Sequence, residues 1–330
     1  MAKSLITLLL LCASLSAQVT GSASPTADDE GNPGASSAQS VNPVFEWNRT
    51  LLVIVRTPVA QPPTIHSTRS FAILHAGIQP GGYQLTPPNF AAADFTQWPQ
   101  VTPFALARAD EFRPGPPPEL TSDEYTSVFD EVKSLGFIHS TTRTPEQTLI
   151  GMFWNGNIQD FWNEIAQTAA LRHHLNLAQS ARLFALLNIS LADTTIALFD
   201  AKYTYQFWRP VTAIQMAGSD GNPSTDPNPT WLPLTTKTAP DPAYPGAHSA
   251  ISAAGAEVLR FYFGERFTFD VRSESLAGVT RHFTSFSAAA QEAGLSRIYA
   301  GQHFRSDHIA GKALGRQVAE FIDETILLPR

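Results

Sequence analysis

The feature that most constrains the fold is a series of segments whose apolar residues recur with helical spacing. Two long stretches rich in proline and glycine interrupt this series, at residues 77–120 and 218–244. Connections of this length are uncommon in compact domains, and they are usually functional or wrap a core. Few runs alternate with a period of two, and no hairpin turn is evident. We therefore predict an all-α fold, a multi-helix bundle with long Pro/Gly-rich loops.

Helix starts and apolar periodicity together define the individual elements. A start is expected near Thr121, where Ser122 precedes an acidic pair, and another near Arg143, where Pro145 falls in the first turn. The other expected helices cover residues 45–55, 68–76, 158–171, 175–187, 190–203, 211–213, 247–262, 273–293, 295–304 and 307–326. No internal repeat is evident.

The N-terminus has the pattern of a secretory signal peptide. Lys3 supplies a positive charge, residues 5–11 form a short apolar run, and Ala17 or Ala23 offers a small-residue cleavage point. We therefore assign residues 1–23 to a signal peptide and expect a secreted or periplasmic protein.

The rest of the chain is expected to form one domain. Residues 24–43 are rich in Ser, Ala, Gly and Asp and are predicted to be a disordered leader. Residues 44–330 then form a single helical domain. The chain has one cysteine, Cys12, so a mature protein without the signal peptide has no disulfide. Outside the N-terminal run, no window of about 18 apolar residues is expected to span a membrane.

Charge excludes one class of partner. The chain has 22 Lys and Arg against 29 Asp and Glu, which gives a formal net charge of −7. A general nucleic-acid binder is basic, so nucleic acid is not expected to be a partner. Any site for an anion must instead be a local concentration of basic residues.

Such a concentration occurs in three short segments, at residues 202–210, 242–249 and 296–307. They contribute three cations, two histidines, a carboxylate and a backbone turn at a helix start: Lys202, Arg209, Arg297, His248, His303, Asp307 and Gly246–Ala247. Cations neutralise a bound oxyanion, and backbone N–H groups at a helix start bind its oxygens. One histidine can bond the central atom while the other moves protons.

The spacing within these segments places the side chains. Lys202 is expected in the last turn of a helix, and Arg209 in the turn after it, because Arg209 precedes a proline and avoids the α region. Pro210 then opens a short helix. His303 and Asp307 are four residues apart and can touch on one helix face. The carboxylate can hold the imidazole Nδ1–H and leave Nε2 free as a ligand or nucleophile.

The three segments together resemble the signature of the vanadium-dependent haloperoxidase and type 2 phosphatidic acid phosphatase superfamily. The resemblance is closest to the soluble, bacterial haloperoxidase-like branch. The family pattern is Lys-x6-Arg-Pro, then Pro-Ser-Gly-His, then Ser-Arg-x5-His-x3-Asp. This chain matches the first and third parts fully, and the resemblance covers roughly residues 121–324. It implies a helical bundle with an anion held in a pocket among the helices.

The resemblance also implies a role for each residue. Three cations would bind the equatorial oxygens of the oxyanion: Lys202, Arg209 and Arg297. His303 would be the axial ligand to vanadium or a phosphate-accepting nucleophile, with Asp307 orienting it. His248 would be the acid–base histidine on the opposite side. The implied cofactor is vanadate; in a phosphatase there is none, and phosphate is part of the substrate.

Two positions depart from the family pattern. Gly246 and Ala247 stand where the family has Ser-Gly, so a hydroxyl that normally bonds the oxyanion is missing and weaker vanadate binding is expected. Asp241 lies seven residues before His248, where relatives carry an aromatic residue or a histidine. A carboxylate there would repel a halide unless it is paired or points away, which disfavours chloride. We interpret Asp241 itself as a solvated loop carboxylate.

These features lead to three functional hypotheses. The first is an exported, vanadate-dependent haloperoxidase-like enzyme that oxidises a halide, bromide rather than chloride, with hydrogen peroxide. The second is a soluble acid phosphatase that cleaves a phosphate ester through a phosphohistidine at His303. The third is a non-catalytic oxyanion-binding protein, which needs the cations but neither His248 nor a His303–Asp307 pair.

Export yields the first testable prediction. In its native host the protein should be cleaved between about residues 17 and 23, because the N-terminal run has the charge, length and small residues of a secretory signal. Mass spectrometry of the mature N-terminus measures this directly. A native protein that begins at Met1 or Ala2 would refute export.

Overall fold

The structure is a computed structural model, and it describes residues 80–328. These residues belong to one compact unit. The expected signal peptide, the leader and the helices expected at residues 45–55 and 68–76 lie outside the described residues. The expectation that the domain begins at residue 44 also lies there.

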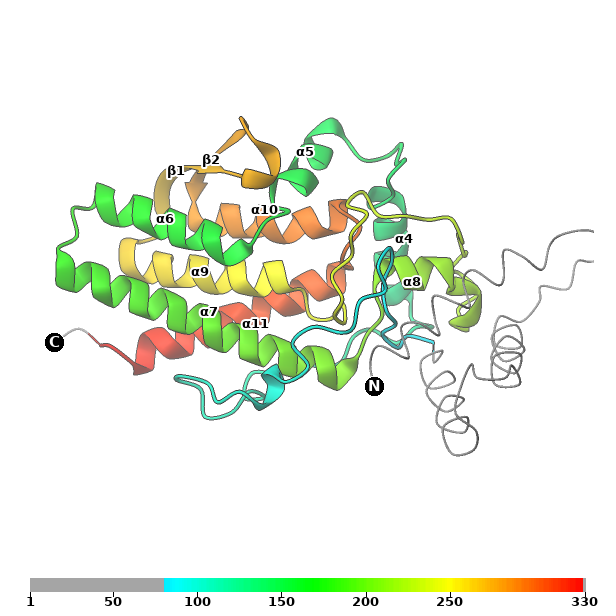
Figure 1. Cartoon of the computed structure of the whole chain (residues 1–330), viewed down its shortest axis with the longest axis horizontal. Coiled ribbons are helices and arrows are strands. Elements are labelled where there is room, and N and C mark those ends of the chain that lie inside the picture. Colours follow the sequence, from blue (N-terminus) through cyan, green and yellow to red (C-terminus); the bar gives the residue numbers. More distant parts are fainter. Residues whose placement is uncertain (1–79, 329–330) are drawn as a thin grey trace, which may run out of the picture. The chain divides into compact units, whose positions relative to one another are not determined.

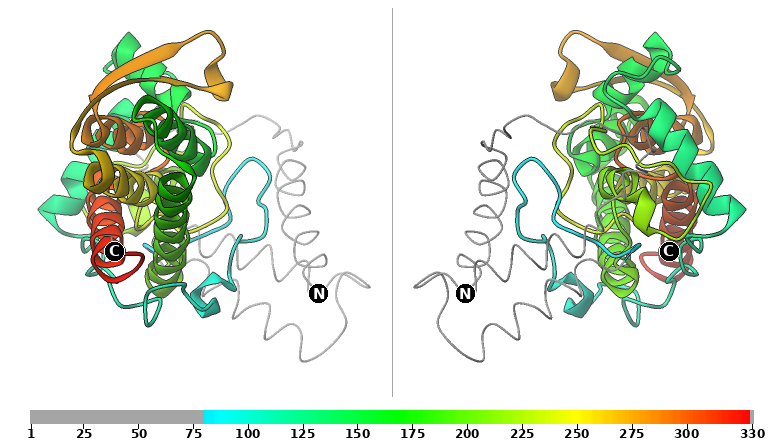
Figure 2. Two further views of the ribbon diagram at one scale, coloured as in Figure 1. Left: turned by 90° about the vertical axis from the view of Figure 1, so that its left-hand side faces the viewer. Right: turned by 90° about the vertical axis from the view of Figure 1, so that its right-hand side faces the viewer.

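Five long helices run side by side and form the bundle (Figure 1). They are α6 (Ile158–Arg172), α7 (Leu177–Tyr205), α9 (Ala247–Phe263), α10 (Phe286–Tyr299) and α11 (Arg305–Thr325). Helix α9 contacts each of the other four, and Figure 2 shows these helices nearly end-on. Buried apolar side chains from all five make one continuous core. The all-α prediction is confirmed by this bundle.

Shorter helices cluster at one end of the bundle: α4 (Asp123–Leu135), α5 (Pro145–Phe153), α8 (Pro210–Gln215) and a 3-10 turn at Ala217–Ser219. A further 3-10 turn at Trp98–Gln100 packs against α7. Helices α4 and α5 begin where the sequence predicted. Ser122 accepts a hydrogen bond from the Tyr125 N–H, and Thr144 and Gln147 form a reciprocal capping box. A second apolar cluster around Trp208 and Trp231 fills this end of the molecule.

The prediction of helix over residues 273–293 was wrong for residues 273–285 and right for residues 286–293. Strands β1 (Arg266–Arg272) and β2 (Thr280–Ser285) form an antiparallel hairpin, with a 3-10 turn at Glu274–Leu276 between them. In β1, apolar residues alternate with polar ones, and Phe269 and Val271 are buried in the core together with Phe283, which pairs with Phe269 from β2. This period of two decides the local structure. Helix α10 therefore begins only at Phe286, and it ends at Tyr299 rather than at residue 304.

The sequence analysis predicted two helices, over residues 175–187 and 190–203, where the structure has the single helix α7 of 29 residues. The pattern Ser190-Leu-Ala-Asp193 looks like a helix start, but Asp193 does not cap α7. Its buried carboxylate accepts the backbone N–H groups of Phe104 and Ala105, both at 2.7 Å, and so fixes the preceding loop to the bundle. A side chain used this way leaves the helix uninterrupted.

Helix α7 has the length and apolarity of a membrane span, which the sequence analysis did not expect. Its most apolar window has a mean hydropathy of 1.5, and 67% of that window is buried. A core helix of a bundle has these same properties.

Helices α9 and α11 cross at very short distance, because glycines lie at their contact. A Cβ added at Gly315 would lie 1.9 Å from the carbonyl oxygen of Ala250, and one at Gly311 would lie 2.4 Å from that of Gly246. Only glycine leaves room for backbone at these distances. The crossing fixes the start of α9 against the start of α11, where Gly246 N–H donates to the Asp307 carbonyl at 2.9 Å.

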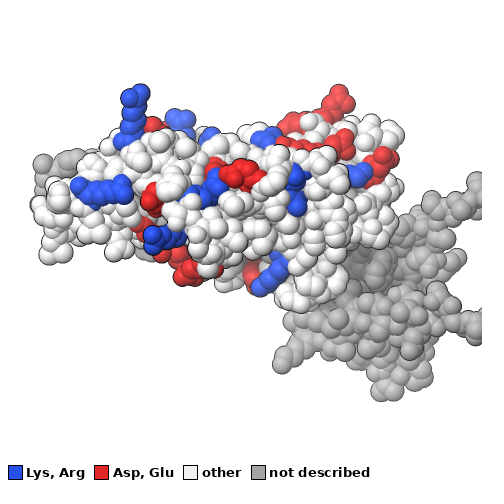
Figure 3. Space-filling view, turned by 90° about the horizontal axis from the view of Figure 1, so that it is seen from above, with Lys and Arg blue, Asp and Glu red and all other residues white. Residues whose placement is uncertain are grey.

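Figure 3 shows one face of the surface, on which basic and acidic side chains are interspersed and most of the area is uncharged. This face offers no broad basic patch.

The α9–α11 crossing yields the second prediction. Gly315→Ala should lower the free energy of unfolding by roughly 3 kcal/mol, the upper part of the range for overpacking, because the new methyl group meets backbone and not a movable side chain. Chemical denaturation measures the change. Gly115→Ala is the control, since nothing lies within 4 Å of the added atom. Equal stability of the two variants would contradict this account of the crossing.

Candidate active site

The three predicted segments meet at one end of the bundle. There the C-terminal ends of α7 and α10 adjoin the N-terminal ends of α9 and α11 (Figure 1). The chain leaves α7 through Gln206, which is left-handed, and Arg209 is extended before Pro210 opens α8. Lys202 lies in the last turn of α7, as the spacing predicted.

Lys202 and Arg209 share one buried carboxylate. Asp241 Oδ1 lies 2.8 Å from Lys202 Nζ and 2.8 Å from Arg209 Nη2. Arg209 Nε also donates to the Asp241 carbonyl oxygen at 2.8 Å, and Lys202 Nζ donates to the carbonyl oxygens of Pro242 and Ala243. Lys202 is fully buried, and Arg209 is 2% exposed.

The interpretation of Asp241 as a solvated loop carboxylate was therefore wrong. Asp241 is 8% exposed, and its side chain is the counterion of the two cations. Burial alone would raise the pKa of its carboxyl, but the charges of Lys202 and Arg209 outweigh burial and hold that pKa below its ordinary value. A buried charge is tolerated only when it is paired in this way.

His303 and Asp307 meet at the start of α11. His303 Nδ1 lies 3.0 Å from Asp307 Oδ2, and the same oxygen accepts the Phe304 N–H at 2.9 Å. Arg209 Nη1 lies 3.1 Å from His303 Nε2. Because a guanidinium only donates, Nε2 must carry the lone pair and Nδ1 the proton. The ring is thus fixed in the tautomer that leaves Nε2 able to bond an electrophilic centre.

Arg297 lies near the end of α10 and is 8% exposed. Its Nη1 donates to Asn155 Oδ1 at 3.0 Å, whereas its buried Nε has no hydrogen-bond partner among residues 80–328. Burial, and then the charge of Arg209, lowers the pKa of Arg297 to about 10, so it remains a cation at neutral pH. Its Nε is an unused donor in the site.

His248 lies in the first turn of α9 and is half-buried. Its Nε2 is 3.0 Å from the carbonyl oxygen of Trp154. A carbonyl only accepts, so Nε2 carries the proton and donates it there. Burial, followed by the charge of Arg297, lowers the pKa of His248 well below its ordinary value.

Burial and the nearby cations favour the neutral form of the His303 imidazole. Burial, then the charges of Arg209 and Lys202, lowers the pKa of His303 well below its usual range. Burial raises the pKa of Asp307 to about 7, and the Phe304 N–H and the charges of Lys202 and Arg209 oppose this rise only in part. Neutral His303 is the form that binds a metal or attacks phosphorus.

The turn before α9 accommodates Gly246 and Ala247 in place of the family's Ser-Gly. Gly246 has φ −79° and Ala247 is the first residue of the helix, so neither position requires a left-handed conformation and the exchange of glycine for alanine costs no backbone strain. The nearby hydroxyl of Ser249 does not replace the missing serine, since it is 2.8 Å from His308 Nδ1.

The arrangement fits a tetrahedral or trigonal oxyanion. His303 Nε2 presents a lone pair beside the Arg209 guanidinium, and the unpartnered Arg297 Nε supplies a donor. Within residues 80–328 no group of three His, Cys, Asp or Glu side chains is placed to hold a metal ion. The donor set therefore suits vanadate, which cations hold through its oxygens while one histidine bonds the metal. It suits a phosphoryl group equally.

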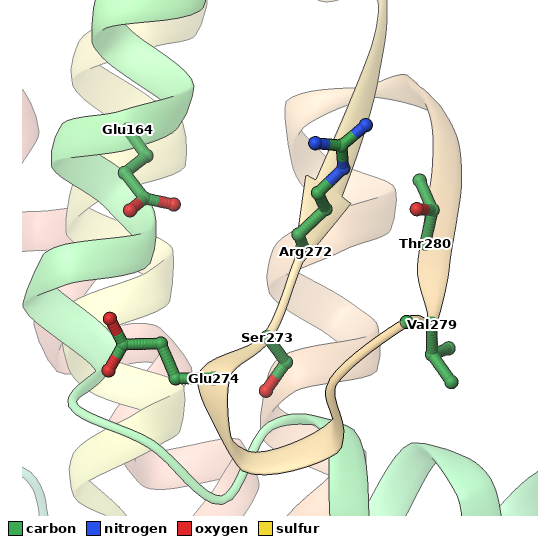
Figure 4. Close-up of a pocket in the computed structure, with 7 residues that line it drawn as sticks. Glu164, Arg272, Ser273, Glu274, Val279 and Thr280 are labelled. Atoms are coloured by element: carbon green, nitrogen blue, oxygen red, sulfur yellow. The ribbon is translucent and has the colours of Figure 1, made fainter.

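A separate surface pocket lies at the tip of the β1–β2 hairpin against α6 (Figure 4). Glu164, Arg272 and Glu274 are its charged residues. None of the predicted site residues lines it. With two carboxylates and one guanidinium, it lacks the excess of positive charge that an oxyanion requires.

The sequence analysis misinterpreted one partner of the site and missed two others. Asp241 was noted beside the segment that begins at Pro242, but its pairing with the cations was not predicted. Asn155 and the Trp154 carbonyl could not be found, because they belong to the turn between α5 and α6 and carry no motif.

Comparison with known proteins agrees with this fold. A family model described as the VCPO second helical-bundle domain matches residues 182–327. A vanadium chloroperoxidase of Curvularia inaequalis is 26% identical over 274 residues, which is 62% of this chain and 44% of the relative. The chain thus spans less than half the length of that curated relative.

Solved structures give the same fold. The first bacterial vanadium-dependent iodoperoxidase superposes with a TM-score of 0.67 at 30% identity, covering 75% of this chain and 60% of that one. A holo-type bacterial vanadium-dependent chloroperoxidase superposes at 0.55 with 17% identity, covering 71% and 55%. The helical bundle is thus the fold of the vanadium haloperoxidases. The chain is similar to this family over these regions.

The third prediction concerns Asp307. Asp307→Asn should weaken binding of inorganic phosphate about tenfold, because the carboxamide can present its NH₂ to His303 Nδ1 and no longer fixes the tautomer. Calorimetry with phosphate at constant pH and salt measures the affinity. Glu324→Gln, an exposed exchange on the same helix, is the control. An unchanged affinity in Asp307→Asn would show that Asp307 does not orient the ligand histidine.

Proposed function

We propose that this chain is a vanadate-dependent haloperoxidase-like enzyme that oxidises a halide with hydrogen peroxide. The observation that carries the proposal is the His303 imidazole, whose Nδ1–H donates to Asp307 and whose Nε2 keeps a lone pair that accepts from Arg209. The likeness of the chain to the vanadium haloperoxidases supports the proposal.

The residues divide the work as follows. Lys202, Arg209 and Arg297 hold the oxygens of the oxyanion, and His303 Nε2 bonds the central atom. Bound vanadate supplies a Lewis acid that activates hydrogen peroxide toward the halide. Lys202 stabilises negative charge on the peroxide oxygen. The burial of the cluster excludes bulk water and strengthens each of these interactions.

His248 moves the proton. As a neutral imidazole it can accept a proton from hydrogen peroxide on one ring nitrogen and return it to the departing oxygen as water forms. The balanced reaction is hydrogen peroxide, halide and one proton giving hypohalous acid and water. Because Nε2 donates to the Trp154 carbonyl, the lone pair that accepts the proton lies on Nδ1 of His248.

The halide is proposed to be one more easily oxidised than chloride, with bromide as the first candidate. The solved relative at 30% identity is an iodoperoxidase, whereas the solved chloroperoxidase is 17% identical. The curated relative at 26% identity is a chloroperoxidase. The ion pairs of Asp241 weaken the electrostatic argument against chloride, so the halides are compared directly in the test. Export to the periplasm or medium remains part of the proposal.

The fourth prediction tests the activity. Protein incubated with vanadate should bind about one vanadium per chain and consume peroxide in a bromide-dependent reaction. His248→Ala should retain vanadium but lose at least about a hundredfold in turnover, the usual size of general acid–base catalysis. His282→Ala, an exposed histidine of the hairpin, is the matched control.

Metal analysis and assays with chloride, bromide and iodide distinguish the alternatives. Phosphate-ester hydrolysis without vanadium, lost on changing His303, would favour the phosphatase. Oxyanion binding without any turnover would favour a binding protein. Either result would overturn the haloperoxidase proposal.

A further inference from the structure

The position of Asp241 has a consequence for which anions the site accepts. Its Oδ1 lies at hydrogen-bond distance from both Lys202 Nζ and Arg209 Nη2, each at 2.8 Å. An oxygen of a bound oxyanion would need the same two donors. The carboxylate oxygen thus stands where a ligand oxygen would bridge the two cations.

We propose that Asp241 is a specificity-determining residue, an internal anion that competes with the bound oxyanion for Lys202 and Arg209 and makes the site discriminate against ions of higher charge. This proposal rests on the oxyanion site of the proposed function, and it concerns binding rather than turnover.

The charges of the cluster support this inference. Lys202, Arg209 and Arg297 contribute three positive charges. The negative charge of Asp241, which contacts Lys202 and Arg209, reduces the net charge of the cluster by one. An entering oxyanion must displace or share these ion pairs, and its oxygens are repelled by the carboxylate at short range. Since Coulomb energy scales with the charge of the ligand, the penalty is about twice as large for a dianion as for a monoanion.

Lys202 and Arg209 each have acceptors besides the Asp241 carboxylate. Lys202 Nζ also donates to the carbonyl oxygens of Pro242 and Ala243. Arg209 also donates to the backbone oxygens of Asp241 and Gln302 and to His303 Nε2. An asparagine at position 241 retains the shape and the backbone contact and removes only the charge.

Sulfate and perchlorate test the proposal, because both are tetrahedral and they carry two charges and one charge at neutral pH. Calorimetry on wild type and Asp241→Asn, without peroxide, vanadate or halide, gives the affinities. Removal of the carboxylate should tighten perchlorate binding roughly tenfold and sulfate binding roughly a hundredfold. Asp226→Asn is the control, as it removes an exposed charge from the same loop.

Each outcome decides the matter. Unchanged or weaker sulfate binding in Asp241→Asn would overturn the proposal and make Asp241 a positioning residue. An equal gain for both ions would overturn the charge discrimination. If no oxyanion binds to either protein, both the role of Asp241 and the proposed function fail. A gain in sulfate affinity without any peroxidase turnover would support the role of Asp241 and would count against the proposed function alone.

Stability gives a second readout if Asp241→Asn folds poorly. Sulfate should replace the lost counterion, so it should raise the thermal midpoint of Asp241→Asn, or of Asp241→Ser, more than that of wild type. A variant that does not fold even in sulfate would show that the carboxylate is a structural counterion, and it would contradict competition.

Discussion

The structure depends on how three buried cations are compensated. Lys202, Arg209 and Arg297 lie at one end of the bundle with little or no exposure, and burial of an unpaired charge is strongly unfavourable. The chain answers with Asp241 and with carbonyl and carboxamide oxygens from the loops that surround the site. The long loop before α9 thus brings oxygen atoms to Lys202 and Arg209, and the short turn between α5 and α6 brings Asn155 to Arg297.

The same requirement explains the tight crossing of α9 and α11. His248 belongs to the first, while His303 and Asp307 lie at the start of the second. Glycines at the crossing bring the two helix starts together, so the Gly246 N–H can donate to the Asp307 carbonyl. Site geometry therefore rests on backbone packing, which is rigid, and less on side-chain contacts, which could adjust.

Much of this could be predicted from sequence, and the failures have physical causes. The spacing of Lys202, Arg209, His303 and Asp307 gave their local geometry, because each lies within one or two turns of its partner. Asp241 was misjudged because a loop carboxylate is usually solvated, and only the tertiary structure brings it to Lys202, 39 positions earlier in the chain. The hairpin was missed because a short alternation in β1 was outweighed by the helical pattern that follows it.

The central claim is that the cation cluster and His303 Nε2 form one oxyanion site. A crystal structure of the protein soaked in vanadate tests it most directly. The account predicts one vanadium bonded to His303 Nε2, with its oxygens within hydrogen-bond distance of Lys202, Arg209 and Arg297. Vanadate bound elsewhere, for example beside Arg272 at the hairpin pocket, with the His303–Arg209 contact intact, would contradict it.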